Sequence, residues 1–204
     1  MVLLVQWSPN QRFYVSPDKH LAYLNIHKNG STTMRNIVEK LNFSECDISS
    51  LPIGVTVMIV LREDIIMRWI SDITTYLHLD YRSIIDAHHI TNALTQIVFD
   101  DHSAMQSSFL RGTEDFNRVF FKLGVDFKHT IKHFMYQNGY DIPSSKYKNS
   151  TKQKTGDELR NYHTIKDHAL MAVHNNRLVT FFQDDYHLIE KTTFYKDTIG
   201  SSSI

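Results

Sequence analysis

The amino-acid sequence predicts an α/β fold, in which a parallel sheet is flanked by helices and followed by a helical C-terminal region. Apolar, strand-like segments are each followed by a segment with apolar residues at helical spacing, which is the order of elements in a βαβ unit. Only 4 prolines and 7 glycines interrupt the 204 residues, and no stretch has the composition of a linker. We therefore expect one domain over residues 1–204.

The first two predicted strands cover residues 20–27 and 55–61. The second is nearly all apolar and rich in β-branched residues, as expected of a central strand covered on both faces. A helical pattern follows each strand, because apolar side chains recur every three or four positions there. These side chains are Met34, Ile37, Val38 and Leu41 after the first strand, and Ile66, Trp69, Ile70, Ile73 and Leu77 after the second.

The second half of the chain continues the pattern less regularly. Residues 118–123 predict a third strand, followed by a helix over residues 126–138. Two more helices are predicted over residues 157–174 and 178–191. The polar, lysine-rich stretch at 143–156 is expected to form a surface loop, and the serine-rich tail at 200–204 is expected to fray.

Composition excludes several classes of function. Lys and Arg (22) balance Asp and Glu (22), so the basic excess of a nucleic-acid binder is missing. The single cysteine, Cys46, cannot form an internal disulfide or a cysteine-rich zinc site, and it fits a reducing compartment. The longest apolar run, at 55–61, is far short of the ~20 residues that span a bilayer. We therefore expect a cytoplasmic protein without a transmembrane segment.

The turn between the first strand and its helix has the composition of an anion cradle. Glycine lets the backbone approach a ligand closely, and a helix N-terminus presents N–H groups and the positive end of its dipole. Lysine and three hydroxyl residues surround this glycine. The expected anion-binding residues are Lys28, Asn29, Gly30, Ser31, Thr32 and Thr33. The alternative is a helix that Ser or Thr caps without any ligand.

This turn is not a Walker A motif, because Lys28 precedes its only glycine instead of following a second one. It resembles the 5′-phosphosulfate-binding loop of sulfotransferases, which use 3′-phosphoadenosine 5′-phosphosulfate (PAPS) as donor. The likeness is to the carbohydrate and membrane-type sulfotransferases, whose loop reads Pro-Lys-x-Gly/Ala-Ser/Thr-Ser/Thr; His27 stands here at the place of proline. The resemblance implies a P-loop-like sheet and a small bacterial or viral member of the family.

A second motif follows the strand at 55–61. Residues 62–71 resemble the family segment Arg-Asp/Glu-Pro-x-x-Arg-x-x-Ser, without the proline and with one additional residue before the serine. The resemblance implies that Arg62 and Ser71 hold the 3′-phosphate of the donor. Arginine suits that role because its guanidinium offers a rigid, two-pronged set of donors. Weaker likenesses at 101–106, 147–152 and 181–189 follow the order of the family.

The resemblance implies a transfer of the sulfuryl group of PAPS to a hydroxyl of a glycan, lipid or small molecule. Lys28 would stabilise the leaving phosphate, so we expect no metal. His102 is the first candidate for the general base that the acceptor hydroxyl requires, with Glu63, His88 and His89 as competitors. Two other classes stay open: an ATP-dependent kinase of the P-loop type, and a non-catalytic domain that binds a nucleotide or sugar.

Overall fold

The computed structural model describes residues 9–76, 101, 104–142, 163–164, 167, 171 and 177–196. They contain a five-stranded sheet in the order β3-β1-β2-β4-β5. The strands are β1 (Phe13–Val15), β2 (Leu21–Leu24), β3 (Ser44–Cys46), β4 (Thr56–Leu61) and β5 (Asn117–Lys122). The three predicted strands and the α/β class are confirmed.

The prediction of a parallel sheet is only partly right. β2, β4 and β5 are parallel neighbours, but β1 pairs antiparallel with both β2 and β3. The sheet is therefore mixed. β1 and β3 have only three residues each, too few to show a period-2 pattern in the sequence, and β3 is largely exposed at the edge.

β4 is the central strand that its composition predicts. Val57, Ile59 and Leu61 pack into a hydrophobic cluster on one face of the sheet. Met58 and Val60 pack into a second cluster on the opposite face. Because both faces are covered, both sets of side chains are buried, which accounts for the nearly uninterrupted apolar run.

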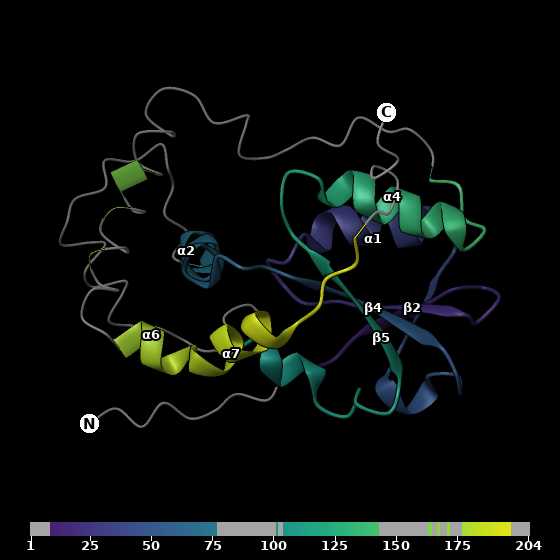
Figure 1. Ribbon diagram of the computed structural model, residues 1–204, viewed down its shortest axis with the longest axis horizontal. Coiled ribbons are helices and arrows are strands. Elements are labelled where there is room, and N and C mark those ends of the chain that lie inside the picture. The colour runs from purple at the N-terminus through teal and green to yellow at the C-terminus, as the bar shows by residue number, and fades with distance from the viewer. Residues whose placement is uncertain are drawn as a thin grey trace, which may run out of the picture.

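The two clusters are covered by different elements (Figure 1). Helices α1 (Ser31–Lys40) and α4 (Phe127–Gln137) lie together over one face. The 3-10 turns η1 (Ile48–Ser50) and η2 (Ser107–Leu110) and helix α7 (Gln183–Lys191) cover the other. This three-layer arrangement is what buries a sheet on both sides.

The C-terminal region differs from its prediction. The single helix expected at 178–191 is two helices, α6 (Arg177–Phe181) and α7, separated at the buried residue Phe182. After α7 the chain runs along β5, where the Tyr195 N–H donates to the Phe120 carbonyl at 2.8 Å. The predicted loop at 143–156, the tail at 200–204 and most of the predicted helix at 157–174 lie outside the described residues.

Helix α2 (Ile65–Tyr76) follows β4 and lies beyond the carboxyl ends of the parallel strands (Figure 1). The Asp64 carboxylate accepts a hydrogen bond from the Met67 N–H at 2.9 Å, which satisfies one of the free donors of the first turn. Asp64 thus starts the helix where the family motif has proline. In the described part of the chain, no helix has the length and apolarity to cross a membrane.

Candidate functional site

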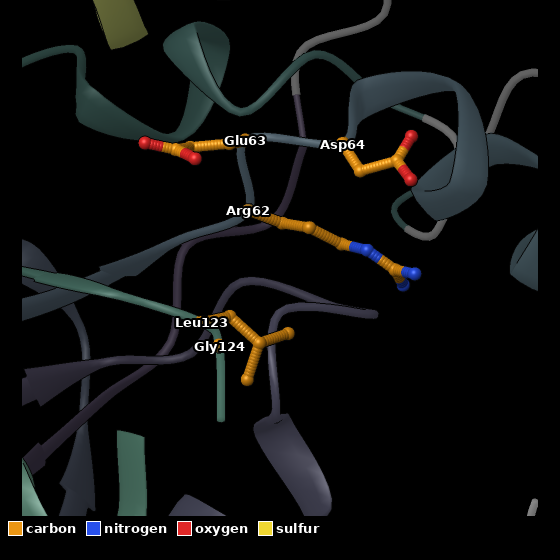
Figure 2. Close-up of a pocket in the computed structure, with 5 residues that line it drawn as sticks. All are labelled: Arg62, Glu63, Asp64, Leu123 and Gly124. Carbon is orange, nitrogen blue, oxygen red and sulfur yellow. The ribbon is translucent and has the colours of Figure 1, made fainter. Parts of the chain in front are cut away.

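The β2–α1 loop and Arg62 begin at one edge of the sheet, because parallel neighbours end at the same edge, whereas Ser71 lies further along the chain in α2. The loops after β2, β4 and β5 all begin there. A pocket of about 490 Å³ opens at this edge and is lined by Arg62, Glu63, Asp64, Leu123 and Gly124 (Figure 2). Its size lies within the ~300–1,000 Å³ of ligand pockets, and its position is the usual one for ligands of open α/β sheets.

The loop between β2 and α1 contains two residues with left-handed backbone. Gly30 has φ 73°, and Lys28 has φ 63°, an uncommon conformation for a residue with a side chain. Gly30 is the N-cap of α1, and no side chain caps the helix. The simple capping role considered for Ser31, Thr32 and Thr33 is therefore not what the structure contains. The first N–H groups of α1 have no partner in their own helix.

Leu123 connects this loop to the pocket. A Cβ atom placed on Gly30 would lie 3.0 Å from Leu123 Cδ1 and 3.3 Å from Phe127 Cε1. The loop therefore packs tightly against the segment after β5, and Leu123 also lines the pocket. Glycine is needed at position 30 for two reasons, its backbone conformation and the closeness of these side chains.

The Asn29 side chain is engaged inside the protein. Its side chain is fully buried, and Nδ2 donates to the Val60 carbonyl at 2.9 Å and to Gln106 Oε1 at 2.5 Å. Its backbone N–H donates to the Ile26 carbonyl at 3.3 Å. Asn29 thus fixes the loop to the end of β4, and its amide nitrogen is directed into the protein.

Gln106 is a residue of this edge whose contribution the sequence does not reveal. Besides contacting Asn29, its Oε1 accepts a hydrogen bond from the Arg62 N–H at 2.8 Å. Its Nε2 donates to the Arg62 carbonyl at 3.0 Å. One fully buried side chain therefore joins the loops that follow β2 and β4. Arg62 and Gln106 are 44 positions apart in the sequence, so no local sequence pattern could predict this pairing.

The three residues after β4 point in different directions. Figure 2 shows the Arg62 side chain extending beyond the end of the strand, with Glu63 directed away from it. The Glu63 carboxylate forms an ion pair with the Lys122 ammonium at 2.6 Å, on the neighbouring strand β5. Arg62 thus reaches the edge of the sheet as predicted, whereas Glu63 is engaged by a cation.

Ser71 lies in α2, six residues after the helix begins, and does not line the pocket. It is three residues after Arg68 and therefore shares a helix face with it. Arg68 is fully buried, and its Nε donates to the His27 carbonyl at 3.2 Å. The face of α2 that carries Ser71 thus contacts the start of the β2–α1 loop through Arg68, a residue to which the motif assigned no role.

Asp185, in α7, fixes the backbone from which the Gln106 side chain extends. Its two carboxylate oxygens accept hydrogen bonds from the N–H groups of Gln106 at 2.9 Å and Ser107 at 2.8 Å. Burial raises the pKa of the Asp185 carboxyl, and the positive charge of Arg68 and these hydrogen bonds act against that rise. An acidic side chain of α7 therefore fixes the backbone at the start of η2.

Three of the four expected candidates for the general base are histidines. His102, His88 and His89 lie outside the described residues. The described residues contain no group of three His, Cys, Asp or Glu side chains arranged to hold a metal ion.

Comparison with models of protein families, with curated proteins and with solved structures found no match to this chain. The assignment of a function therefore depends on the residues of this chain and on their geometry.

Substitution of Gly30 tests how tightly the cradle is built. Gly30→Ala is expected to lower the free energy of unfolding more than Gly54→Ala, by about 1–3 kcal/mol. Both positions have positive φ, at 73° and 79°, which costs a residue with a Cβ ~1–2 kcal/mol. Only Gly30 has side chains in the way, because nothing lies within 4 Å of a Cβ on Gly54. Urea denaturation measures both; equal losses would contradict tight packing of the loop.

The raised pKa of Asp185 predicts a pH dependence of stability. The native carboxyl keeps its proton at a pH where the unfolded carboxyl, with a pKa near ~3.9, has lost it. The contribution of Asp185 is therefore largest in acid and falls as the pH rises through the native pKa. The difference in unfolding free energy between wild type and Asp185→Asn should shrink from pH 4 to pH 7. Chemical denaturation across that range measures it, and a difference that widens would mean that the carboxylate form is preferred.

Proposed function

We propose that this protein is a PAPS-dependent sulfotransferase, which moves a sulfuryl group to a hydroxyl of a glycan, lipid or small molecule. The proposal depends on one observation above all. The Lys28–Gly30 turn, with two left-handed residues before an uncapped helix, begins at the strand next to the one that Arg62 follows. Neighbouring strands lie about 4.8 Å apart, so the two loops are close enough to bind the two ends of one nucleotide.

The two loops suit different ends of the donor. The first N–H groups of α1, the hydroxyls of Ser31 and Thr33 and the ammonium of Lys28 would hold the 5′-phosphosulfate. Arg62 would hold the 3′-phosphate, because a guanidinium forms paired, charge-assisted hydrogen bonds with phosphate oxygens. This division follows the resemblance of both motifs to the sulfotransferase family.

The proposed reaction is an in-line displacement at sulfur. The acceptor oxygen forms a bond to sulfur while the bond between sulfur and the bridging oxygen of the 5′-phosphate breaks. The electron pair of that bond goes to the leaving phosphate, which yields adenosine 3′,5′-bisphosphate, and a general base takes the hydroxyl proton. Lys28 and the loop N–H groups would stabilise the charge that accumulates on the leaving oxygen, as donors do in an oxyanion hole.

We keep His102 as the proposed base, because it lies in the stretch at 101–106 that resembles the sulfotransferase family. The competitors have less support. The Glu63 carboxylate is paired with Lys122, and His88 and His89 belong to no segment that resembles the family.

Nucleotide binding tests the proposal directly. Adenosine 3′,5′-bisphosphate is expected to raise the melting temperature of the wild-type protein, whereas ATP with Mg²⁺ should have little effect, because binding to the native state alone stabilises it. Stabilisation by ATP with Mg²⁺ alone would support the kinase, and stabilisation by neither nucleotide would support the non-catalytic domain.

Arg62→Ala should weaken binding of adenosine 3′,5′-bisphosphate about 10- to 100-fold and leave binding of adenosine 5′-phosphate nearly unchanged. Equal weakening of both would mean that Arg62 has no role at the 3′-phosphate.

Lysine substitution tests the transfer step. Lys28→Ala is expected to lower the rate at which PAPS is converted to adenosine 3′,5′-bisphosphate by ~10²–10³. The measurement uses any hydroxyl acceptor that supports turnover. Lys19→Ala is the matched control, because Lys19 also has φ 63° but precedes β2, at the opposite end of that strand. Its rate should stay at the wild-type value. Equal rates in the two variants would contradict the assignment of Lys28.

A further inference from the structure

The Gln106 side chain completes the backbone hydrogen bonding at the end of β4. Its amide group pairs with both the N–H and the carbonyl of Arg62, at 2.8 and 3.0 Å. This is the reciprocal pairing that a neighbouring strand would provide. Because both polar groups of Arg62 are fixed, the direction in which its side chain leaves the backbone is fixed as well.

The same amide oxygen also holds the β2–α1 loop. Gln106 Oε1 accepts from Asn29 Nδ2 at 2.5 Å and from the Arg62 N–H at 2.8 Å, so a single atom contacts both residues, and Asn29 Nδ2 also donates to the Val60 carbonyl. Asn29 lies between Lys28 and Gly30, the two residues with left-handed backbone. A movement of the Gln106 amide would therefore displace both loops together.

Gln106 itself is anchored from the opposite side. The buried Asp185 carboxylate accepts from the N–H groups of Gln106 and Ser107, which fixes the backbone from which the amide extends. Gln106 and Asn29 are both 0% exposed, so water cannot replace their hydrogen bonds. Loss of the amide would leave the buried donor Asn29 Nδ2 and the half-buried Arg62 N–H with one partner fewer, and an unsatisfied buried donor is costly.

We propose that Gln106 is a positioning residue that couples the β2–α1 loop to Arg62, so that the sites for the two ends of the donor form together. This inference rests on the proposed function for the identity of the ligand. The coupling itself is a property of the protein without ligand. Gln106 touches no reacting atom and acts through Asn29 and Arg62.

Amide hydrogen exchange of the full chain without nucleotide tests the coupling. Gln106→Met keeps the size of the side chain and removes all three hydrogen bonds. The N–H groups of Arg62, Asn29 and Met34, which donate to Gln106 Oε1 and to the Ile26 and Gly30 carbonyls, should then exchange about tenfold faster or more. Ser108→Ala is the matched control, because Ser108 is also buried in η2 but donates only to the Met105 carbonyl. Its exchange at those positions should equal that of wild type. Unchanged exchange in Gln106→Met would overturn the proposal.

Asn29→Ala serves the same purpose if Gln106→Met does not fold. It removes the contacts to the loop and leaves the reciprocal pair with Arg62 in place. Exchange should then accelerate at position 29 and at the Met34 N–H, while the Arg62 N–H stays protected. Slow exchange throughout the loop in this variant would overturn the proposal.

A double-mutant cycle extends the test to the donor. In the wild-type and Ser108→Ala backgrounds, Arg62→Ala should weaken binding of adenosine 3′,5′-bisphosphate about 10- to 100-fold. In the Gln106→Met background the same substitution should cost no more than about threefold, because Arg62 is no longer held in place. Equal losses in all backgrounds would overturn the coupling. If wild type does not bind the nucleotide, the proposed function fails, and hydrogen exchange alone decides whether Gln106 couples the loops.

Discussion

The end of the central strand imposes the constraint on which the rest of the site depends. β4 ends at Leu61, and the N–H and carbonyl of the next residue, the half-buried Arg62, need the hydrogen-bond partners that a neighbouring strand would otherwise supply. The Gln106 amide takes the place of that strand by pairing with both polar groups of Arg62. Buried backbone donors and acceptors must find partners, so the position of η2 is determined by β4 as much as by its own packing.

Further buried polar groups hold Gln106 and the β2–α1 loop in place. Asp185 accepts hydrogen bonds from the backbone at the start of η2, and the positive charge of Arg68 lowers the pKa of the Asp185 carboxyl against the effect of burial. Arg68 also donates to the His27 carbonyl and so contacts the start of the β2–α1 loop. Buried charges are costly and add little net stability, but removing one member of such a set is strongly destabilising. The set therefore restricts the arrangement of the loops more than it stabilises the fold.

The geometry of the parallel strands explains why the site occurs at one edge only. β2, β4 and β5 end together, and their loops supply the left-handed turn, Arg62 and Leu123. β1 runs in the opposite direction, so its end contributes nothing there. The unfavourable backbone of Lys28 also lies at this edge, and such conformations persist where the surrounding contacts determine them, as Asn29 and Gly30 do here.

Local sequence determined the elements whose signal extends over many residues. The apolar run at 55–61 predicted a strand buried on both faces, and the spacing of Met34, Ile37 and Val38 predicted the buried face of α1. The glycine between a strand and a helix predicted a tight turn there, and Gly30 has φ 73° in that turn. These features depend on residues within one or two turns of each other.

Only the tertiary structure decided how these elements are connected. β1 and β3 are too short to produce a periodic signal, and their pairing depends on residues up to 33 positions apart, as between Phe13 and Cys46. The partners Asn29, Arg62, Gln106 and Asp185 come from four separate segments, and Gln106 and Asp185 alone are 79 residues apart. Polar residues such as Asn29 and Arg68 are usually exposed, so their burial could not be read from composition. Each is buried because a hydrogen-bond partner from a distant segment meets it there, and no pattern in the neighbouring sequence encodes that partner.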